Sequence, residues 1–209
     1  MADGLRLNLG CGARRMAGYL NVDKEASVRP DLLVDLEVFP WPFESDAVTE
    51  IQMLHVLEHL GHETQKFFGV MCEIYRVCSD NAVVRILAPH HRSESYAGDP
   101  THVRPITAKG ISMFSKDFCR AFAERGWSNT RLAEYLDVDF GIERITYALT
   151  PYWRERLRDG SIDMSEINHA VVTFNNVVEQ IEFVLRAVKS KATQDRLGHS
   201  DGNLAYTIA

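Results

Sequence analysis

The sequence predicts an α/β protein built on an open, mostly parallel sheet with helices on both faces. Two observations support this fold class. Short apolar stretches alternate with crossover segments as far as about residue 88, which is the pattern of parallel strand–crossover–strand units. Two long strand-like stretches then follow in the C-terminal third, which predict an antiparallel C-terminal edge.

The first expected strand is Leu5–Leu9, in which leucines occupy every second position. It runs directly into the glycine turn Gly10-Cys11-Gly12. Glycine tolerates positive φ and lets a ligand approach the backbone closely. At the carboxyl end of a parallel strand, such a turn forms the floor of a nucleotide-type pocket.

The second expected strand, residues 19–23, ends in Asp23 and begins only six residues after the glycine turn. A full helical crossover takes a dozen residues or more. We therefore expect the first crossover helix to be reduced to a turn or lost. Arg15 also stands where a GxGxxG motif has its third glycine, so the stretch is a poor dinucleotide fingerprint.

The remaining elements follow from apolar spacing and from turn residues. The expected strands are 32–36, 50–54, 82–88, 135–149 and 177–188, and the expected helices are 64–77, 107–125 and 163–174. Residues 177–188 fit either a strand or a helix, and a strand is favoured because 135–149 needs an antiparallel partner. Residues 79–81 are expected to form a turn, and the polar residues 190–209 a mobile tail.

Composition narrows the classes of partner. The net charge of -6 argues against a broad nucleic-acid or anionic membrane surface, and no apolar run approaches the length of a membrane span. Residues 1–4 have neither the basic nor the apolar part of a secretory signal, so a cytoplasmic location is expected. The cysteines match no zinc pattern, and reduced thiols without a resident metal are expected; they are Cys11, Cys72, Cys78 and Cys119.

Four blocks together resemble the class I S-adenosylmethionine (SAM)-dependent methyltransferases, in particular the small type 11-like group: Leu7–Gly12, Gly18–Asp23, His55–Leu60 and Asp99–Arg104. The resemblance covers residues 5 to about 125. It implies a Rossmann-like sheet, SAM as the cofactor and a small-molecule acceptor. We expect one methyltransferase domain over residues 1–189, with an acceptor loop at 89–107 and an insertion at 150–178 between the last two strands.

The resemblance also implies which residues bind the cofactor: Asn8, Gly10, Cys11, Gly12, Asp23, Asp35, Leu36, Leu54 and His55. The two glycines would face the methionine part of SAM. Asp23 would accept hydrogen bonds from the ribose hydroxyls, which suits a carboxylate. Asp35 and Leu36 would border the adenine, and the last two residues would lie beneath the sulfonium. Because little chain precedes Leu5, the acceptor loop, the segment after Thr150 or a second subunit must cover the acceptor, so a homodimer is one expected arrangement.

Methyl transfer is an in-line displacement for which the protein supplies orientation, desolvation and sometimes a base. An oxygen acceptor needs proton removal, and histidine suits this role near neutral pH. The candidate bases are His102, His91 and His55, in that order, with Asp99 as an orienting partner for the first. Family association favours O-methylation of a sugar or another polyhydroxylated metabolite. The sequence lacks the Asp/Asn/Ser-Pro-Pro-aromatic tetrapeptide of amino-methylating DNA enzymes, so a DNA-modifying enzyme is not expected.

Three alternatives stay open. The loop residues His90, His91, Asp99 and His102 could hold a metal, because imidazole and carboxylate are ordinary ligands. The stretch from His55 to His59 matches the HxxEH signature of inverted zinc peptidases, with Glu58 as the base. That signature requires a helix, whereas residues 50–54 predict a strand entering the motif. The third alternative is a protein that binds SAM without transferring its methyl group.

Overall fold

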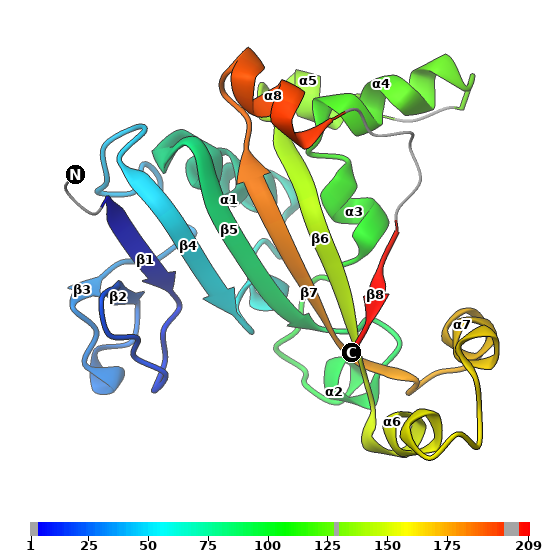
Figure 1. The fold of residues 1–209 in the computed structure, drawn as a ribbon. Coiled ribbons are helices and arrows are strands. Elements are labelled where there is room, and N and C mark those ends of the chain that lie inside the picture. Colours follow the sequence, from blue (N-terminus) through cyan, green and yellow to red (C-terminus); the bar gives the residue numbers. More distant parts are fainter. Residues whose placement is uncertain (1–3, 128–129, 199–204) are drawn as a thin grey trace.

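The computed structural model describes residues 4–127, 130–198 and 205–209. Their strands form one eight-stranded sheet in the order β3-β2-β1-β4-β5-β7-β6-β8 (Figure 1). The strands are β1 (Leu5–Leu9), β2 (Leu20–Asp23), β3 (Leu32–Leu33), β4 (Val48–Leu54), β5 (Cys78–Pro89), β6 (Phe140–Leu149), β7 (Val178–Ala187) and β8 (Thr207–Ile208).

The pairing confirms the predicted mostly parallel sheet. Strands β3, β2, β1, β4 and β5 run parallel to one another, whereas β7 is antiparallel to both β5 and β6. In register, Asn8 of β1 lies between Asn21 of β2 and Gln52 of β4. The carboxyl ends of β1, β2 and β4 therefore meet at one edge, at the bottom of Figure 1. Ligands bind at this edge in open α/β sheets.

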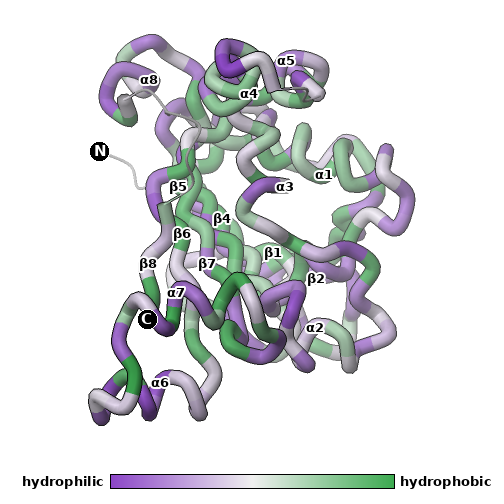
Figure 2. Tube along the Cα trace, turned by 90° about the vertical axis from the view of Figure 1, so that its right-hand side faces the viewer, coloured by the Kyte–Doolittle hydropathy of each residue, from purple (hydrophilic) through white to green (hydrophobic). Residues whose placement is uncertain are grey.

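The helices are α1 (Thr64–Val77), α2 (Glu94–Ala97), α3 (Ala108–Ser112), α4 (Lys116–Glu124), α5 (Leu132–Leu136), α6 (Pro151–Arg158), α7 (Met164–Thr173) and α8 (Lys191–Leu197), with 3-10 turns η1 (Ala26–Val28) and η2 (Leu57–His59). Helices α1 and α3 lie against one face of the sheet, whereas α8 lies over the other face, near the amino ends of the parallel strands (Figures 1 and 2). None of the helices in the described ranges is long and apolar enough to cross a bilayer.

Helix α1 spans the residues predicted from its apolar spacing. Its side chains Phe67, Met71 and Ile74 are buried in the main core, together with Ile51 of β4 and Ile86 of β5. Burial of each such side chain contributes about 1.5–3 kcal/mol. This core fixes β4 against β5 and so fixes the edge at which the turn after β4 emerges.

The opposite face of the sheet is polar and open over its centre. Arg85 of β5 is 37% exposed, and its guanidinium lies 3.8 Å from Glu50 of β4 and 3.9 Å from Glu182 of β7. Arg144 of β6 approaches Glu182 to 3.7 Å. Along β5 the neighbours Val84 and Ile86 point to the covered face and are fully buried. Alternation along the strand thus separates an apolar core from a charged surface.

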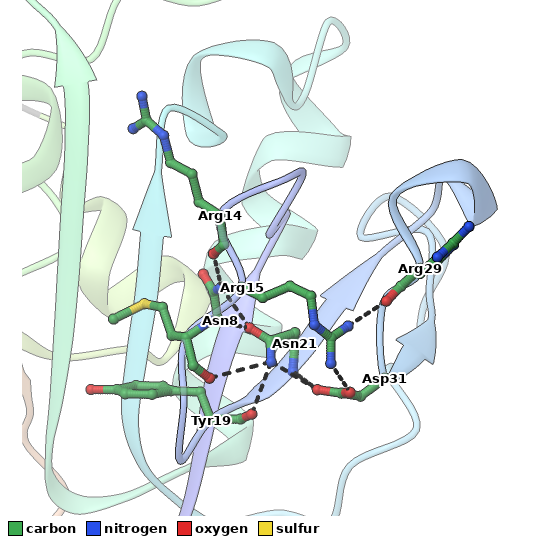
Figure 3. Close-up of polar contacts among 8 residues, drawn as sticks. Asn8, Arg14, Arg15, Tyr19, Asn21, Arg29 and Asp31 are labelled. Carbon is green, nitrogen blue, oxygen red and sulfur yellow. Dashed lines mark hydrogen bonds and ion pairs between the residues drawn. The ribbon is translucent and has the colours of Figure 1, made fainter.

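A hydrogen-bonded turn replaces the first crossover helix, as the short spacing predicts (Figure 3). The buried Asn8 amide donates to the Arg14 carbonyl at 2.8 Å and to the Asn21 side-chain oxygen at 2.9 Å. The backbone and side-chain N–H groups of Asn21 donate to Asp31, whose pKa these bonds lower to about 2. The Arg15 guanidinium donates to the same carboxylate. Arg15, in place of a third glycine, thus ties the turn to the segment after η1.

The prediction of one continuous helix over 107–125 is wrong, because two helices, α3 and α4, form there instead. Ser115 caps α4, and its hydroxyl accepts the Phe118 N–H at 3.3 Å. Phe114 and Phe118 are nonetheless buried, as predicted. The strand predicted over 135–149 begins only at Phe140, because Tyr135 belongs to α5.

Other boundaries also differ from expectation. Residues 79–81 lie within β5 instead of forming a turn, although Asn81 has a φ of 65° and the register shifts there. The strand predicted over 32–36 is reduced to two residues. The predicted tail contains α8 and also β8, which pairs with β6. The strand prediction for 177–188 is confirmed by β7.

Candidate cofactor and acceptor site

A cleft lies at the carboxyl ends of the parallel strands. The cleft has a volume of about 200 Å³. It is lined by Gly10, Asp23, Lys24, Val34, Asp35, Leu36, His55, Val56, His59 and Leu60. The lining comes from the segments that follow β1, β2, β3 and β4, so the sheet edge sets its shape.

The glycine turn forms one wall of the cleft. Gly10 has a φ of 64°, and a Cβ there would lie 2.6 Å from both methyl groups of Val56. Gly12 has a φ of 46°, and a Cβ there would meet no atom within 4 Å. Gly10 is therefore required by the turn and its packing, whereas Gly12 leaves open space beside the backbone.

Asp23 ends β2 beside this turn. One carboxylate oxygen accepts the Gly12 N–H at 2.8 Å, and the other accepts the Glu25 N–H at 3.0 Å. These bonds hold the carboxylate in place at the cleft. Each oxygen keeps a further lone pair, so Asp23 can still accept hydrogen bonds from a ligand.

Asp35 and Leu36 line the cleft after β3, beside the apolar Val34. The Asp35 carboxylate accepts the Glu37 N–H at 2.9 Å, which makes it a turn residue as well. The indole N–H of the buried Trp41 donates to the Leu36 carbonyl at 3.2 Å. The cleft is thus partly apolar on this side, which suits a flat aromatic ring.

His55 follows β4 in the left-handed region, with a φ of 59°. Its N–H donates to the Leu87 carbonyl at 2.8 Å, so pairing with β5 holds this conformation. A non-glycine residue in this region is uncommon, and such strain clusters at functional sites. The side chain lines the cleft, and its Nδ1 lies 3.4 Å from an oxygen of Glu58.

Four predicted cofactor residues lie outside the cleft lining: Asn8, Cys11, Gly12 and Leu54. Asn8 and Cys11 are buried, with exposed fractions of 2% and 4%. The Asn8 amide supports the turn, and burial raises the pKa of the Cys11 thiol. The Gly12 N–H donates a hydrogen bond to Asp23, which lines the cleft.

The predicted pair of His102 and Asp99 lies next to the cleft. The His102 ring lies 4.7 Å from the ring of His59, which lines the cleft. His102 Nδ1 lies 2.8 Å from the Tyr96 carbonyl, and its Nε2 lies 3.7 Å from the Asp99 carboxylate. Hydrogen bonds from Thr101 lower the pKa of Asp99. Asp99 therefore lies near the imidazole without a direct hydrogen bond to it, and its orienting role stays a prediction.

His90 and His91 form a separate pair, with ring centroids 4.3 Å apart. The His90 ring packs on Tyr147 of β6, and burial lowers its pKa to about 4. Neither histidine lines the cleft. Within the described ranges, the metal set suggested for His90, His91, Asp99 and His102 is not brought together, and a different group gathers instead: Glu58, His59 and His102.

The peptidase reading of the HxxEH stretch is not supported. His55 lies in a turn after β4, and only three residues of the stretch form the 3-10 turn η2. The helix that would present both histidines as zinc ligands from one face is therefore missing from this part of the described chain.

Sequence reasoning missed half of the cleft lining: Lys24, Val34, Val56, His59 and Leu60. Each lies within two residues of a predicted site residue or inside the His55–Leu60 block, so continuity along the chain was the available signal. Glu58 was considered only as a peptidase base, and its full burial could not be read from the sequence.

Solved structures provide the comparison for this fold. A SAM-dependent methyltransferase from Archaeoglobus fulgidus is similar with a TM-score of 0.59 and 14% identity, over 88% of this chain and 86% of that one. A SAM-dependent methyltransferase from Methanosarcina mazei gives 0.52 and 11%, over 91% and 95%. The [4+2]-cyclase SpnF gives 0.51 and 16%, over 90% and 76%. No protein-family model and no curated protein sequence matches the chain. The chain thus has the fold of the class I SAM-dependent methyltransferases.

Proposed function

We propose that this chain is a SAM-dependent methyltransferase that acts on a small-molecule acceptor. We further propose O-methylation of a sugar or another polyhydroxylated metabolite. The observation that carries the proposal is the cleft, which combines the glycine turn, an acid at the end of β2 and a strained histidine at the end of β4. The fold neighbours named as SAM-dependent methyltransferases support it.

The lining residues suit the parts of SAM. The open space at Gly12 leaves the backbone accessible, and the Asp23 carboxylate has lone pairs for two adjacent hydroxyls. Val34 and Leu36 offer apolar surface to an aromatic ring. When bound, SAM supplies a methyl group activated by its positively charged sulfur. The protein then has to orient the acceptor and remove its proton.

Of the three predicted bases, His55 is the one that lines the cleft, and we assign the proton-accepting role to it. The hydrogen bond from the His55 N–H to the Leu87 carbonyl fixes the backbone at this residue and so limits the positions that the imidazole ring can take. His102 contacts His59 beside the cleft, and His91 lies beside His90, so neither lines the cleft and we do not assign the proton-accepting role to them.

Calorimetry with SAM and with S-adenosylhomocysteine (SAH) tests the cofactor. We expect micromolar binding of both, and Asp23→Ala should weaken both at least tenfold, by about 1.4 kcal/mol or more. Glu155→Ala removes an exposed acid of α6 and should change nothing. If the unmodified chain binds neither ligand at high micromolar concentration, the proposal fails.

A SAM-binding protein without transfer activity is the second candidate, because a protein of this fold is named for a reaction other than methyl transfer, as a [4+2]-cyclase. Product analysis with SAM and a panel of polyhydroxylated acceptors separates the two. A transferase forms SAH and methylated product, and His55→Ala lowers turnover by a larger factor than it weakens SAH binding. Tight SAM binding without SAH formation across the panel favours the second candidate.

A further inference from the structure

The buried carboxylate of Glu58 has one weak ion-pair contact, with the His55 imidazole, whose Nδ1 lies 3.4 Å from one of its oxygens. The residue is fully buried, and neither of its oxygens has a hydrogen-bond partner among the residues that the structure describes. An isolated carboxylate is strongly disfavoured in such surroundings, so buried charges are paired or bind metals. The group therefore points to a cation that completes the site.

Two imidazoles flank this carboxylate. One ligand atom from each of Glu58, His59 and His102 lies within 4.8 Å of the other two. The rings of His59 and His102 are 4.7 Å apart at their centroids. The three side chains come from η2 and from the acceptor loop, which approach each other only in the folded chain.

Hydrogen bonds orient both imidazoles. His102 Nδ1 lies 2.8 Å from the Tyr96 carbonyl, which can only accept, so the proton is on Nδ1. His59 Nδ1 lies 3.0 Å from the Thr101 hydroxyl oxygen, whose own proton is donated to Asp99 at 2.6 Å. That oxygen must therefore accept from His59 Nδ1. Each ring thus keeps a lone pair on Nε2, which is how metal-binding histidines are oriented.

We propose that Glu58, His59 and His102 bind one divalent transition-metal ion beside the cleft. Two imidazoles and one carboxylate favour Mn²⁺, Fe²⁺, Co²⁺ or Zn²⁺ over Ca²⁺. The Asp99 carboxylate, 3.7 Å from His102 Nε2, adds negative charge next to the site. Ligand atoms around one such ion lie about 3 to 4 Å apart, so a small rotation of the rings closes the site. This departs from the expectation that the chain holds no metal.

Three protein ligands leave coordination positions open. His59 lines the cleft, and His55 lies 3.4 Å from Glu58 on the same side, so the open positions face the cleft. The next step rests on the proposed methyltransferase function. In that case the ion binds an acceptor through adjacent hydroxyl oxygens. Coordination lowers the pKa of a bound hydroxyl.

Arg104 is the competing partner for Glu58, because its buried Nε also lacks a hydrogen-bond partner. Its guanidinium is held elsewhere, since it donates to the Gly61 carbonyl at 2.9 Å and lies 4.4 Å from the Phe67 ring. Among the described residues, no contact within 4.0 Å pairs it with Glu58. The imidazoles are therefore the nearer set of ligands.

The test is titration of the full chain, freed of metal by dialysis against a chelator, with Co²⁺ followed by visible absorption and calorimetry. We expect one ion per chain with micromolar affinity. Glu58→Gln and His102→Ala should each weaken binding at least about tenfold, whereas His62→Ala, an exposed histidine outside the cluster, should not. Circular dichroism confirms that each variant is folded. If Glu58→Gln does not fold, the partly exposed His59→Ala replaces it.

Absence of stoichiometric Co²⁺ binding by the unmodified chain overturns the metal site, as does equal binding by all variants. SAH binding is measured on the same samples. Intact SAH binding without Co²⁺ binding removes the metal site and leaves the proposed function standing. Co²⁺ binding without SAH binding removes the function and leaves the metal site.

Discussion

The main-chain carbonyl of Glu58 accepts the N–H of Val103 at 2.9 Å, and the next N–H, from Arg104, also reaches it at 3.2 Å. These bonds fasten the acceptor loop to η2, the turn that lines the cleft after β4. The loop carries His102, and η2 carries His59. The distance between the two imidazoles therefore depends on backbone bonds that also shape the cleft.

The two glycines of the turn should respond differently to alanine. Gly10→Ala places a Cβ 2.6 Å from the Val56 methyls at positive φ, and we expect a loss of about 2–4 kcal/mol of unfolding free energy. Gly12→Ala meets no atom within 4 Å and should cost only about 1 kcal/mol, yet weaken SAH binding because it adds a methyl group where we propose that the ligand approaches the backbone. Urea unfolding and calorimetry check both, and equal stability losses would contradict the account.

The turn that replaces the crossover helix depends on Asn21 more than on Arg15. Asn21→Ala removes the acceptor of the Met16 N–H and one of the two acceptors of the buried Asn8 amide, so a loss of about 2–4 kcal/mol is expected. Arg15→Ala removes an exposed ion pair with Asp31 and should cost less than about 1 kcal/mol. Chemical denaturation measures both, and a larger loss for the arginine variant would show that the network is misassigned.

His90 should make stability depend on pH. Burial and the neighbouring cationic groups of His91 and Arg92 lower its pKa from 6.5 to about 4. Between these values the unfolded chain binds a proton that the folded chain does not, so the unfolding free energy falls as pH falls from 6.5 to 4. The loss is on the order of 1–3 kcal/mol. His90→Asn should flatten this dependence in unfolding measured across pH, whereas the exposed His169→Asn should leave it unchanged.

Substitutions at two adjacent positions of β7, which face opposite sides of the sheet, should differ in how much stability they cost. Glu182 lies on the open face between Arg85 and Arg144, so Glu182→Gln should cost less than about 1 kcal/mol. Ile181 on the covered face is 1% exposed, and Ile181→Ala should cost about 2–5 kcal/mol. Thermal unfolding compares them. Similar costs would mean that something covers the charged face in solution.

Elements that pack on one face could be predicted from the sequence. In α1, Phe67, Met71 and Ile74 recur at helical spacing because one side of the helix is buried. In β7, the buried Ile181 and Phe183 flank Glu182, which lies on the opposite, charged face of the sheet. The break between α3 and α4 was missed because Phe114 and Phe118 keep helical spacing across it, while the Ser115 cap is a weaker signal.

The candidate site was predictable where it follows strand ends. Gly10, Asp23 and His55 each follow a recognisable strand, and all three line the cleft. The group of Glu58, His59 and His102 was not predictable, because its members meet through the bonds between η2 and the acceptor loop. Neither their distance nor the burial of Glu58 leaves a pattern in the sequence.

The central claim is that the cleft beside Gly10 and Asp23 binds SAM. A crystal structure of the full chain with SAH tests it most directly. We predict ligand density in the cleft, with the ribose hydroxyls within hydrogen-bond distance of the Asp23 carboxylate and the adenine beside Val34 and Leu36. Density for SAH at another place, or an empty cleft at saturating SAH, would contradict the account.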